Sequence, residues 1–343
     1  MIGAVGCAEP TAEVAEPVAG TAVISFAEYR ARTLGAFGPA SGATGINERG
    51  EVVGSSATPS GAERAFLWRA GQGLHDLGTL GGDFSQASDI NDKGEIVGAS
   101  DLASGVTRGF RWTEEKGMIA LGTLGGKSSH ARAINNRREI VGESEIAAGK
   151  LRAFLWRPGK GMRNLRTLGG RSSQAMDINE ATQVVGFSET DDGHAHAFLW
   201  TAERGMEDLG TLGGENSSAF AISESGEVVG ASDTPEGNSV AFRWTRVEGM
   251  RSLGTLGGET SAGWGVNSRG QVIGSSETDG FQLRPFVWTE ETGMQLLPTL
   301  GGTFGRGEDI NELGLIAGIS RNVGERNRAT LWKPTPGSPS DPD

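Results

Sequence analysis

Residues 85–121 read SQASDINDKGEIVGASDLASGVTRGFRWTEEKGMIAL and contain nearly the whole repeating unit of the chain. The Ile-Asn dipeptide and the tryptophan of this stretch recur at a constant interval of 44 residues, without insertions. Two independent markers in one register are typical of tandem structural repeats. The second dipeptide position holds Asn47, Asn91, Asn135, Asn179, Ser223, Asn267 and Asn311, and the tryptophans are Trp68, Trp112, Trp156, Trp200, Trp244, Trp288 and Trp332.

Each unit divides into four short segments, which in the quoted copy are residues 85–91, 95–100, 109–112 and 118–121. All have the length of a strand and are bounded by Gly, Asn, Asp or Ser, and no window shows a helical period. An Asn-x-x-Gly turn, as at Asn91 to Gly94, joins the first two segments into a tight hairpin. Four strands per repeat of this length indicate the blade of a β-propeller.

The two chain ends complete each other. The seventh unit has no fourth segment after Trp332, whereas residues 32–39 resemble the Leu-Gly-Thr-Leu-Gly-Gly block that ends the other units. We therefore expect residues 22–36 to supply the missing outer strand. The sequence thus predicts an all-β, seven-bladed propeller over residues 22–334, with four-stranded antiparallel blades and a last blade closed by the N-terminal strand. Residues 1–21 are expected to form a flexible tether and residues 335–343 a disordered tail.

Two repeated blocks have structural interpretations. In Phe66-Leu67-Trp68 and its copies, Phe and Trp share one strand face, and we expect them to pack between blades rather than to stack on sugars. The Thr-Leu-Gly-Gly block, as at Thr79 to Gly82, is expected to reverse the chain between blades. A phosphate cradle would require a following helix, and none is predicted.

Composition excludes several classes of protein. A net charge of −12 and an isoelectric point near 5.0 argue against a nucleic-acid partner. No apolar run is long enough for a transmembrane helix. The one cysteine, Cys7, follows Ala-Val-Gly and weakly resembles a bacterial lipidation site, with a plain cysteine in a terminal tether as the alternative. We expect no cofactor and a monomer.

The triplet His196-Ala197-Phe198, followed by Leu-Trp, resembles the bacterial extracellular repeat family named after its His-Ala-Phe (HAF) motif. The resemblance covers residues 30–333 and includes the Thr-Leu-Gly-Gly, Ile-Asn and Val-Val-Gly blocks, although only one unit has all three letters. It implies an exported, extracellular or cell-surface protein, and it implies no reaction.

Sequence identity between units breaks down at one face of the predicted ring. Loops between the second and third segments vary, as does the residue after each Gly pair. Variable loops on a rigid scaffold are common binding sites, with drift of solvated loops as the alternative. Trp264 is the one tryptophan out of register, and either local packing or a ligand contact would account for it. The predicted ligand-binding residues at the channel mouth are Asp83, Lys127, His130, Arg171, Glu215, Glu259 and Trp264.

Catalytic and metal patterns are weak. His194 and His196 share a strand face, but a zinc site needs a third ligand. Asp89, Asp177 and Asp309 recur before Ile-Asn and are expected to bond the local backbone. We therefore expect a non-enzymatic extracellular binding scaffold for a carbohydrate or a protein. The alternatives are a lyase or glycoside-cleaving enzyme at the channel mouth and a purely structural surface spacer.

Overall fold

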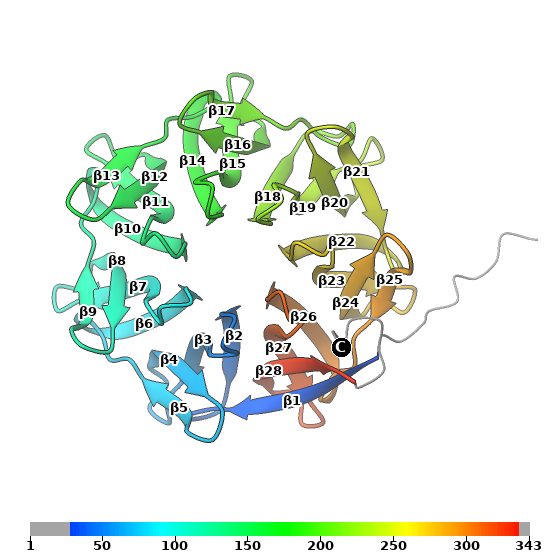
Figure 1. The fold of residues 1–343 in the computed structure, drawn as a ribbon, viewed down its shortest axis with the longest axis horizontal. Coiled ribbons are helices and arrows are strands. Elements are labelled where there is room, and N and C mark those ends of the chain that lie inside the picture. The colour runs from blue at the N-terminus through cyan, green and yellow to red at the C-terminus, as the bar shows by residue number, and fades with distance from the viewer. Residues whose placement is uncertain (1–27, 336–343) are drawn as a thin grey trace, which may run out of the picture.

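The computed structural model describes residues 28–335, and every regular element in that range is a β-strand. The strands form seven four-stranded antiparallel sheets arranged as blades around a central channel (Figure 1). The seven-bladed propeller expected from the sequence is confirmed. The predictions for residues 1–21, including the lipidation of Cys7, and for residues 336–343 lie outside the described part of the chain.

The blades follow one another in chain order, and the innermost strand of each comes first. Blade 1 comprises β2 (Ser41–Ile46), β3 (Val52–Ala57), β4 (Glu63–Arg69) and β5 (Gly73–Asp76). Blade 2 comprises β6 (Gly81–Ile90), β7 (Ile96–Leu102), β8 (Thr107–Thr113) and β9 (Gly117–Ala120). Blade 3 comprises β10 (Gly125–Ile134), β11 (Ile140–Ile146), β12 (Leu151–Arg157) and β13 (Gly161–Asn164).

The remaining blades have the same plan. Blade 4 comprises β14 (Gly169–Ile178), β15 (Val184–Thr190), β16 (Ala195–Thr201) and β17 (Gly205–Asp208). Blade 5 comprises β18 (Ser217–Ile222), β19 (Val228–Asp233), β20 (Ser239–Thr245) and β21 (Gly249–Gly254). Blade 6 comprises β22 (Gly257–Val266), β23 (Val272–Thr278), β24 (Leu283–Thr289) and β25 (Gly293–Leu296). Blade 7 comprises β26 (Gly301–Ile310), β27 (Ile316–Asn322), β28 (Asn327–Pro334) and β1 (Tyr29–Gly35).

The ring is closed by the two ends of the described chain. Strand β1 pairs antiparallel with β28, from Tyr29 opposite Pro334 to Gly35 opposite Ala329. This pairing gives the last blade its fourth strand, as the sequence predicts, and leaves no open sheet edge between the first and last repeats. The strand begins at Tyr29, and residues 22–27 of the predicted segment lie outside the described range.

The Gly pair lies elsewhere than predicted. The chain passes between blades 1 and 2 at residues 77–80, and Gly81 already opens the inner strand with a φ of +111°. A Cβ atom at Gly82 would lie 2.7 Å from the carbonyl oxygen of Leu102. The second glycine is therefore needed for close contact with the neighbouring strand rather than for a chain reversal.

Aromatic side chains from the third strand of each blade fill the space between blades. Phe110 and Trp112 of blade 2, for example, pack against Ala65 and Leu67 of blade 1. Trp332 is fully buried in blade 7, and its Nε1 donates a hydrogen bond to the carbonyl of Pro298 at 2.6 Å. Trp68, Trp112 and Trp200 are also buried, whereas Trp156, Trp244 and Trp288 are partly buried.

Candidate functional site

The central channel is lined by one residue of each innermost strand that a β-bulge turns out of the ladder. In β6 the pairing shifts between Ala87 and Asp89, so that Ser88 is left unpaired. The corresponding residues line the narrow middle of the channel, and we call this set the channel ring. Its members are Thr44, Ser88, Arg132, Met176, Phe220, Trp264 and Glu308.

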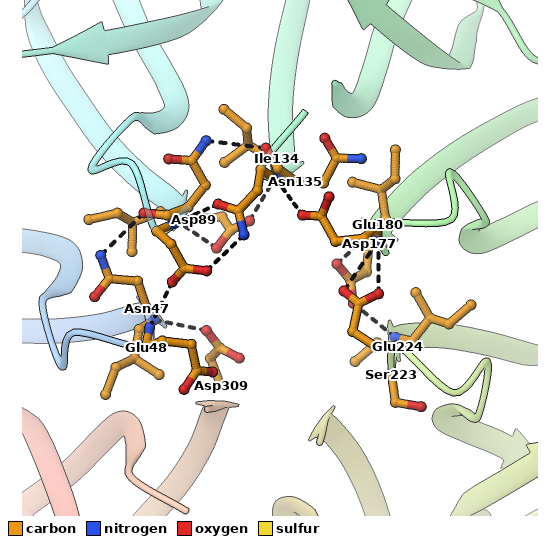
Figure 2. A pocket seen from close by; sticks show the side chains of 18 of the residues that line it. Asn47, Glu48, Asp89, Ile134, Asn135, Asp177, Glu180, Ser223, Glu224 and Asp309 are labelled. Carbon is orange, nitrogen blue, oxygen red and sulfur yellow. Dashed lines mark hydrogen bonds between the residues drawn. The ribbon is translucent and has the colours of Figure 1, made fainter. Parts of the chain in front are cut away.

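One end of the channel, which we call the turn mouth, is formed by the Asn-x-x-Gly turns and opens into a cavity of about 430 Å³ (Figure 2). Around it, the asparagine side chains join neighbouring blades. Asn91 Nδ2 donates to the backbone carbonyl of Asn135, and Asn135 Nδ2 donates to that of Asn179, both at 3.2 Å. Each Oδ1 also accepts backbone N–H bonds within its own turn, as Asn135 does from Arg137 and Glu139.

A second ring of contacts surrounds the turn mouth. The backbone N–H of Asp92 donates to Asn136 Oδ1, that of Asn136 to Glu180 and that of Glu180 to Glu224. Eight carboxylates border this cavity without a lysine, arginine or histidine among the lining residues. Burial raises the pKa of Glu48 and of Glu224. Most of these polar groups therefore already have partners within the protein, and the ring they form holds the blades together.

Asp89, Asp177 and Asp309 lie deeper in the channel and connect blades in the same manner. Asp89 accepts from the backbone N–H of Ile90 in its own blade and from that of Ile134 in the next blade. Asp177 and Asp309 make equivalent pairs of bonds. Burial raises the pKa of each to about 7, and repulsion between the three carboxylates adds to this effect. The geometry agrees with the expected role of bonding the backbone.

One junction lacks all of these links. Ser223 replaces the asparagine of blade 5, and its hydroxyl bonds Ser225 instead of reaching blade 6. Ser268 has the position that accepts in the second ring of the other blades, and no hydrogen bond within residues 28–335 joins it to the backbone N–H of Glu224. Among the described residues, neither ring of hydrogen bonds nor an aspartate joins blade 5 to blade 6. We call this interface the 5–6 junction.

The opposite end of the channel, the loop mouth, is formed by the variable loops. At the 5–6 junction, the rings of Phe220 and Trp264 stack with centroids 4.3 Å apart and an angle of 15° between planes. The guanidinium of Arg306 in blade 7 also lies over the Trp264 ring, 4.7 Å from its centroid, and Arg306 Nε donates to Glu308. Burial raises the pKa of Glu308 to about 7. This stack breaks the sevenfold repetition of the channel.

A cavity of about 310 Å³ lies beside the stack on the loop side. Most of its wall is apolar or small, and Trp264 Nε1 donates to Ser275 Oγ at 3.4 Å. The lining residues come from the first and second strands of blades 5 and 6 and from the starts of their third strands: Phe220, Ala231, Ser239, Thr260, Ser261, Ala262, Trp264, Ser275 and Leu283. This cavity is large enough for a small ligand or one protein side chain.

The other predicted ligand residues are spread around the loop mouth. Asp83, Lys127, Arg171, Glu215 and Glu259 are exposed and follow the Gly pairs of five successive blades. The backbone N–H groups of Lys127, Arg171 and Glu259 donate to Glu145, Glu189 and Glu277, respectively. The structure therefore distributes these residues over the rim, and Trp264 alone of the predicted set lines the cavity at the 5–6 junction.

His130 belongs to a separate charged cluster in blade 3. Its Nδ1 lies 3.3 Å from Glu143 Oε1, and Arg132 forms two hydrogen bonds with the same carboxylate, at 3.1 and 2.7 Å. Glu143 is buried, and the hydrogen bonds from His130 and Arg132 outweigh that burial and lower its pKa. The buried carboxylate is thus satisfied within one blade.

The two histidines of blade 4 have different acidic partners. His196 Nδ1 lies 2.8 Å from Asp208 Oδ2, and His194 Nδ1 lies 3.8 Å from Glu215 Oε2. Within residues 28–335, no group of three or more His, Cys, Asp or Glu side chains is arranged to hold a metal ion. In the same range, no helix is long and apolar enough to cross a membrane.

Sequence reasoning missed the residues that surround Trp264. Phe220 occupies the same repeat position one blade earlier. Aromatic residues at one position of two neighbouring blades predict a stacked pair, and this pattern could have identified Phe220. Phe281 is 80 % exposed at a loop tip near the cavity and has a φ of +57°. Five other blades have a glycine at that position, namely Gly61, Gly105, Gly149, Gly193 and Gly237. Comparison of the loops position by position would have found it.

Comparisons with known proteins support the architecture alone. No family model matches the chain, and no curated protein is similar to it in sequence. Among solved structures, the propeller domain of the Trilobed protease from Pyrococcus furiosus is 9% identical, with a TM-score of 0.53 over 86% of this chain and 96% of that one. That domain is described as having an open velcro topology, whereas β1 closes the ring here.

Two further structures have similar scores. The BP39L lectin from Burkholderia pseudomallei is 7% identical, with a TM-score of 0.52 over 92% of this chain and 98% of the lectin. A puromycin-hydrolyzing peptidase from Mycobacterium tuberculosis is 13% identical, with a TM-score of 0.51 over 89% of this chain and 56% of the peptidase. At these identities the likeness is one of fold, and function has to be argued from the site.

Proposed function

We propose that this chain is a non-enzymatic binding module whose ligand occupies the loop mouth of the propeller. The observation that carries the proposal is the 5–6 junction, where the stacked pair Phe220 and Trp264 borders a cavity of about 310 Å³. Aromatic and apolar walls on a rigid scaffold are typical of ligand sites. The other predicted ligand residues would set the electrostatic potential at the loop mouth. They are Asp83, Lys127, His130, Arg171, Glu215 and Glu259.

The turn mouth is the weaker candidate, because its polar groups bond neighbouring blades. Asn135, for example, uses Oδ1 for two backbone N–H groups and Nδ2 for Glu139 and the Asn179 carbonyl. A ligand there would have to replace bonds that hold the ring together, which costs about 1 kcal/mol or more for each bond lost.

The module is proposed to act outside the cell. This part of the proposal rests on the resemblance of the repeats to the HAF family, and Cys7 is the candidate for a lipid anchor. Cell fractionation and mass spectrometry of the native N-terminus test it. Recovery of the chain in the cytoplasm with an unmodified N-terminus would contradict it.

The binding proposal is tested by screening the purified chain on glycan and peptide arrays. The decisive variant is Trp264→Thr, because blade 1 has Thr44 in the same position. We expect it to lose about tenfold or more in affinity for the ligand found. Glu312→Ser is the matched control at the turn mouth, because blade 6 has Ser268 there, and it should bind as the unchanged chain does.

Each other outcome has a defined meaning. Release of product from a polysaccharide would replace the proposal with the lyase or glycosidase alternative. The absence of binding on both arrays would favour a structural spacer. Equal affinity for the unchanged chain and the Trp264→Thr variant would place the ligand away from the loop mouth and contradict the proposal.

A further inference from the structure

We propose that the loop side of the 5–6 junction binds a peptide segment that inserts one apolar side chain into the cavity beside Phe220 and places flanking Lys or Arg residues against its acidic rim. This inference names the ligand class for the proposed function and rests on it. Four observations support it: small residues that leave the cavity open, hydroxyl groups in its wall that already have partners, an exposed phenylalanine and an acidic rim.

The cavity lies where two neighbouring repeat positions hold small residues in both blade 5 and blade 6. Ala231 pairs with Ser218 in blade 5, and Ser275 pairs with Ala262 in blade 6. In blades 3, 4 and 7, the position of Ala231 holds Glu143, Phe187 and Ile319. A Cβ atom added at Gly42 of blade 1 would lie 3.0 Å from Ile319 Cδ1, so a large side chain at this position reaches the next blade. At the 5–6 junction that volume is left open.

The wall suits an apolar group better than a sugar. Phe220 stacks on the Trp264 ring and the guanidinium of Arg306 also lies over it, which leaves little of the ring free to stack on a pyranose. Ser261 Oγ already donates to the Gly254 carbonyl and accepts from the Ala241 N–H. Since hydroxyl groups buried without partners cost about 1–3 kcal/mol each, a saccharide would be penalised where a hydrocarbon side chain would not.

Phe281 extends this apolar surface to the rim. It lies two residues before Leu283, which lines the cavity, and it is 80 % exposed. Its φ of +57° is unfavourable for a side chain with a Cβ atom, and the same loop position is glycine in blades 1 to 5. An exposed aromatic residue held in a strained conformation is a candidate for ligand contact.

The rim of the junction is acidic. Glu236, Glu259 and Asp279 are exposed on the loops of blades 5 and 6. No lysine occurs between residues 161 and 332. Arg284 is the one arginine at the loop end of these two blades, and its Nη1 donates to Gln282 at 3.1 Å. A cationic flank on the peptide would therefore complement the charge around the cavity.

The test uses three fluorescein-labelled, capped pentapeptides and fluorescence anisotropy with the full chain. The first has tryptophan between two arginines, the second has tryptophan between two glutamates, and the third has serine between two arginines. We expect the first to bind, and each of the others to bind about tenfold or more weakly. Equal binding of the first and third would contradict insertion of an apolar side chain, and equal binding of the first two would contradict the role of the rim.

Two variants locate the site. Ala231→Phe fills the cavity with the residue that blade 4 has at this position, and it should lower the affinity for the first peptide about tenfold or more. Phe281→Gly restores the glycine that blades 1 to 5 have at this position, so it should raise the melting temperature while weakening binding several-fold. A change that stabilises the fold and yet weakens binding shows that Phe281 contacts the ligand, because loss of a structural residue would lower both. Val323→Ser, which removes an exposed apolar residue from the adjacent loop of blade 7, is the control and should change neither quantity.

Failure of this inference is distinguishable from failure of the proposed function. If the first peptide does not bind, but a different array ligand depends on Trp264, the peptide proposal is wrong and the binding module stands. If the first peptide binds equally well to the Ala231→Phe and Phe281→Gly variants, the cavity is not its site, and this inference is overturned.

Discussion

The two mouths of the channel are built from the same seven inner strands, yet they differ in what their side chains do. At the turn mouth, asparagines and carboxylates recur from blade to blade and bond the neighbouring blade. At the loop mouth, the residues differ from blade to blade, and the 5–6 junction holds an aromatic stack beside a cavity. Repetition therefore marks the groups that hold the ring together. We expect a ligand to bind where the repetition is broken, because the side chains there are not already bonded to the neighbouring blade.

The largest expected effect is at the turn mouth. Asn135→Ala removes two accepted backbone hydrogen bonds and the donations to Glu139 and to the Asn179 carbonyl. Because these groups are buried, we expect the free energy of unfolding to fall by about 3 kcal/mol. Denaturant titration measures the loss. Asn135→Ser, which copies Ser223, should lose about half as much, and a negligible loss in Asn135→Ala would show that the ring is not structural.

The three channel aspartates predict a dependence of stability on pH. Their pKa is raised from 3.8 to about 7 in the folded chain, so the folded state binds protons more tightly than the unfolded state. Their contribution to stability is therefore fully present below about pH 4 and is lost as the pH rises through 7. The side chains still border the channel, and solvent there screens part of the effect.

The measurement is a series of unfolding curves between pH 5 and pH 8. Asp177→Ala, which copies Ala133 and Ala221 of the adjacent blades, should flatten the decline by roughly a quarter, because the pKa of Glu308 is also raised to about 7 and the change removes one of four such groups. Stability that rises over this pH range would contradict the environment described for these carboxylates.

Repair of the broken ring is expected to have a smaller effect. Ser223→Asn supplies a side chain able to reach the carbonyl of Asn267, which is the link that six other junctions have. One added hydrogen bond should stabilise the fold by about 1 kcal/mol. Thermal unfolding of the variant, compared with that of the unchanged chain, checks this expectation. Destabilisation would mean that blades 5 and 6 are spaced too far apart for the link.

The smallest effect concerns backbone strain on the loop side. Arg166 has a φ of +71° at a position that is glycine in four other blades, as at Gly122 and Gly210. Arg166→Gly should stabilise the fold by about 0.5–1 kcal/mol, because the left-handed conformation is costly for residues with a Cβ atom. Unlike Phe281→Gly, it should leave peptide binding unchanged. Loss of peptide binding in Arg166→Gly would mean that the binding site reaches across the loop mouth to blade 3.

The sequence predicted the parts of the structure that repeat. The interval between Trp68 and Trp112 defines the blade, and the match between residues 32–39 and the Thr-Leu-Gly-Gly blocks predicts the closing strand. The Thr-Leu-Gly-Gly block does lie at the crossing between blades, but the role predicted for its second glycine was wrong. The need for Gly82 arises from contact with Leu102, which no local pattern records. The cavity was missed because it results from small residues on two different blades. Trp264 was identified because it breaks the register, but its stacking on Phe220 depends on the geometry of the ring.

The most direct test of the account is a crystal structure of the chain grown with the pentapeptide that has tryptophan between two arginines. We predict density for the peptide tryptophan in the cavity between Phe220 and Leu283, with the arginines toward Glu259 and Asp279, and an unchanged asparagine ring at the opposite mouth. Peptide density among Asp89, Asp177 and Asp309 at the turn mouth would contradict the division of the channel into a structural end and a binding end.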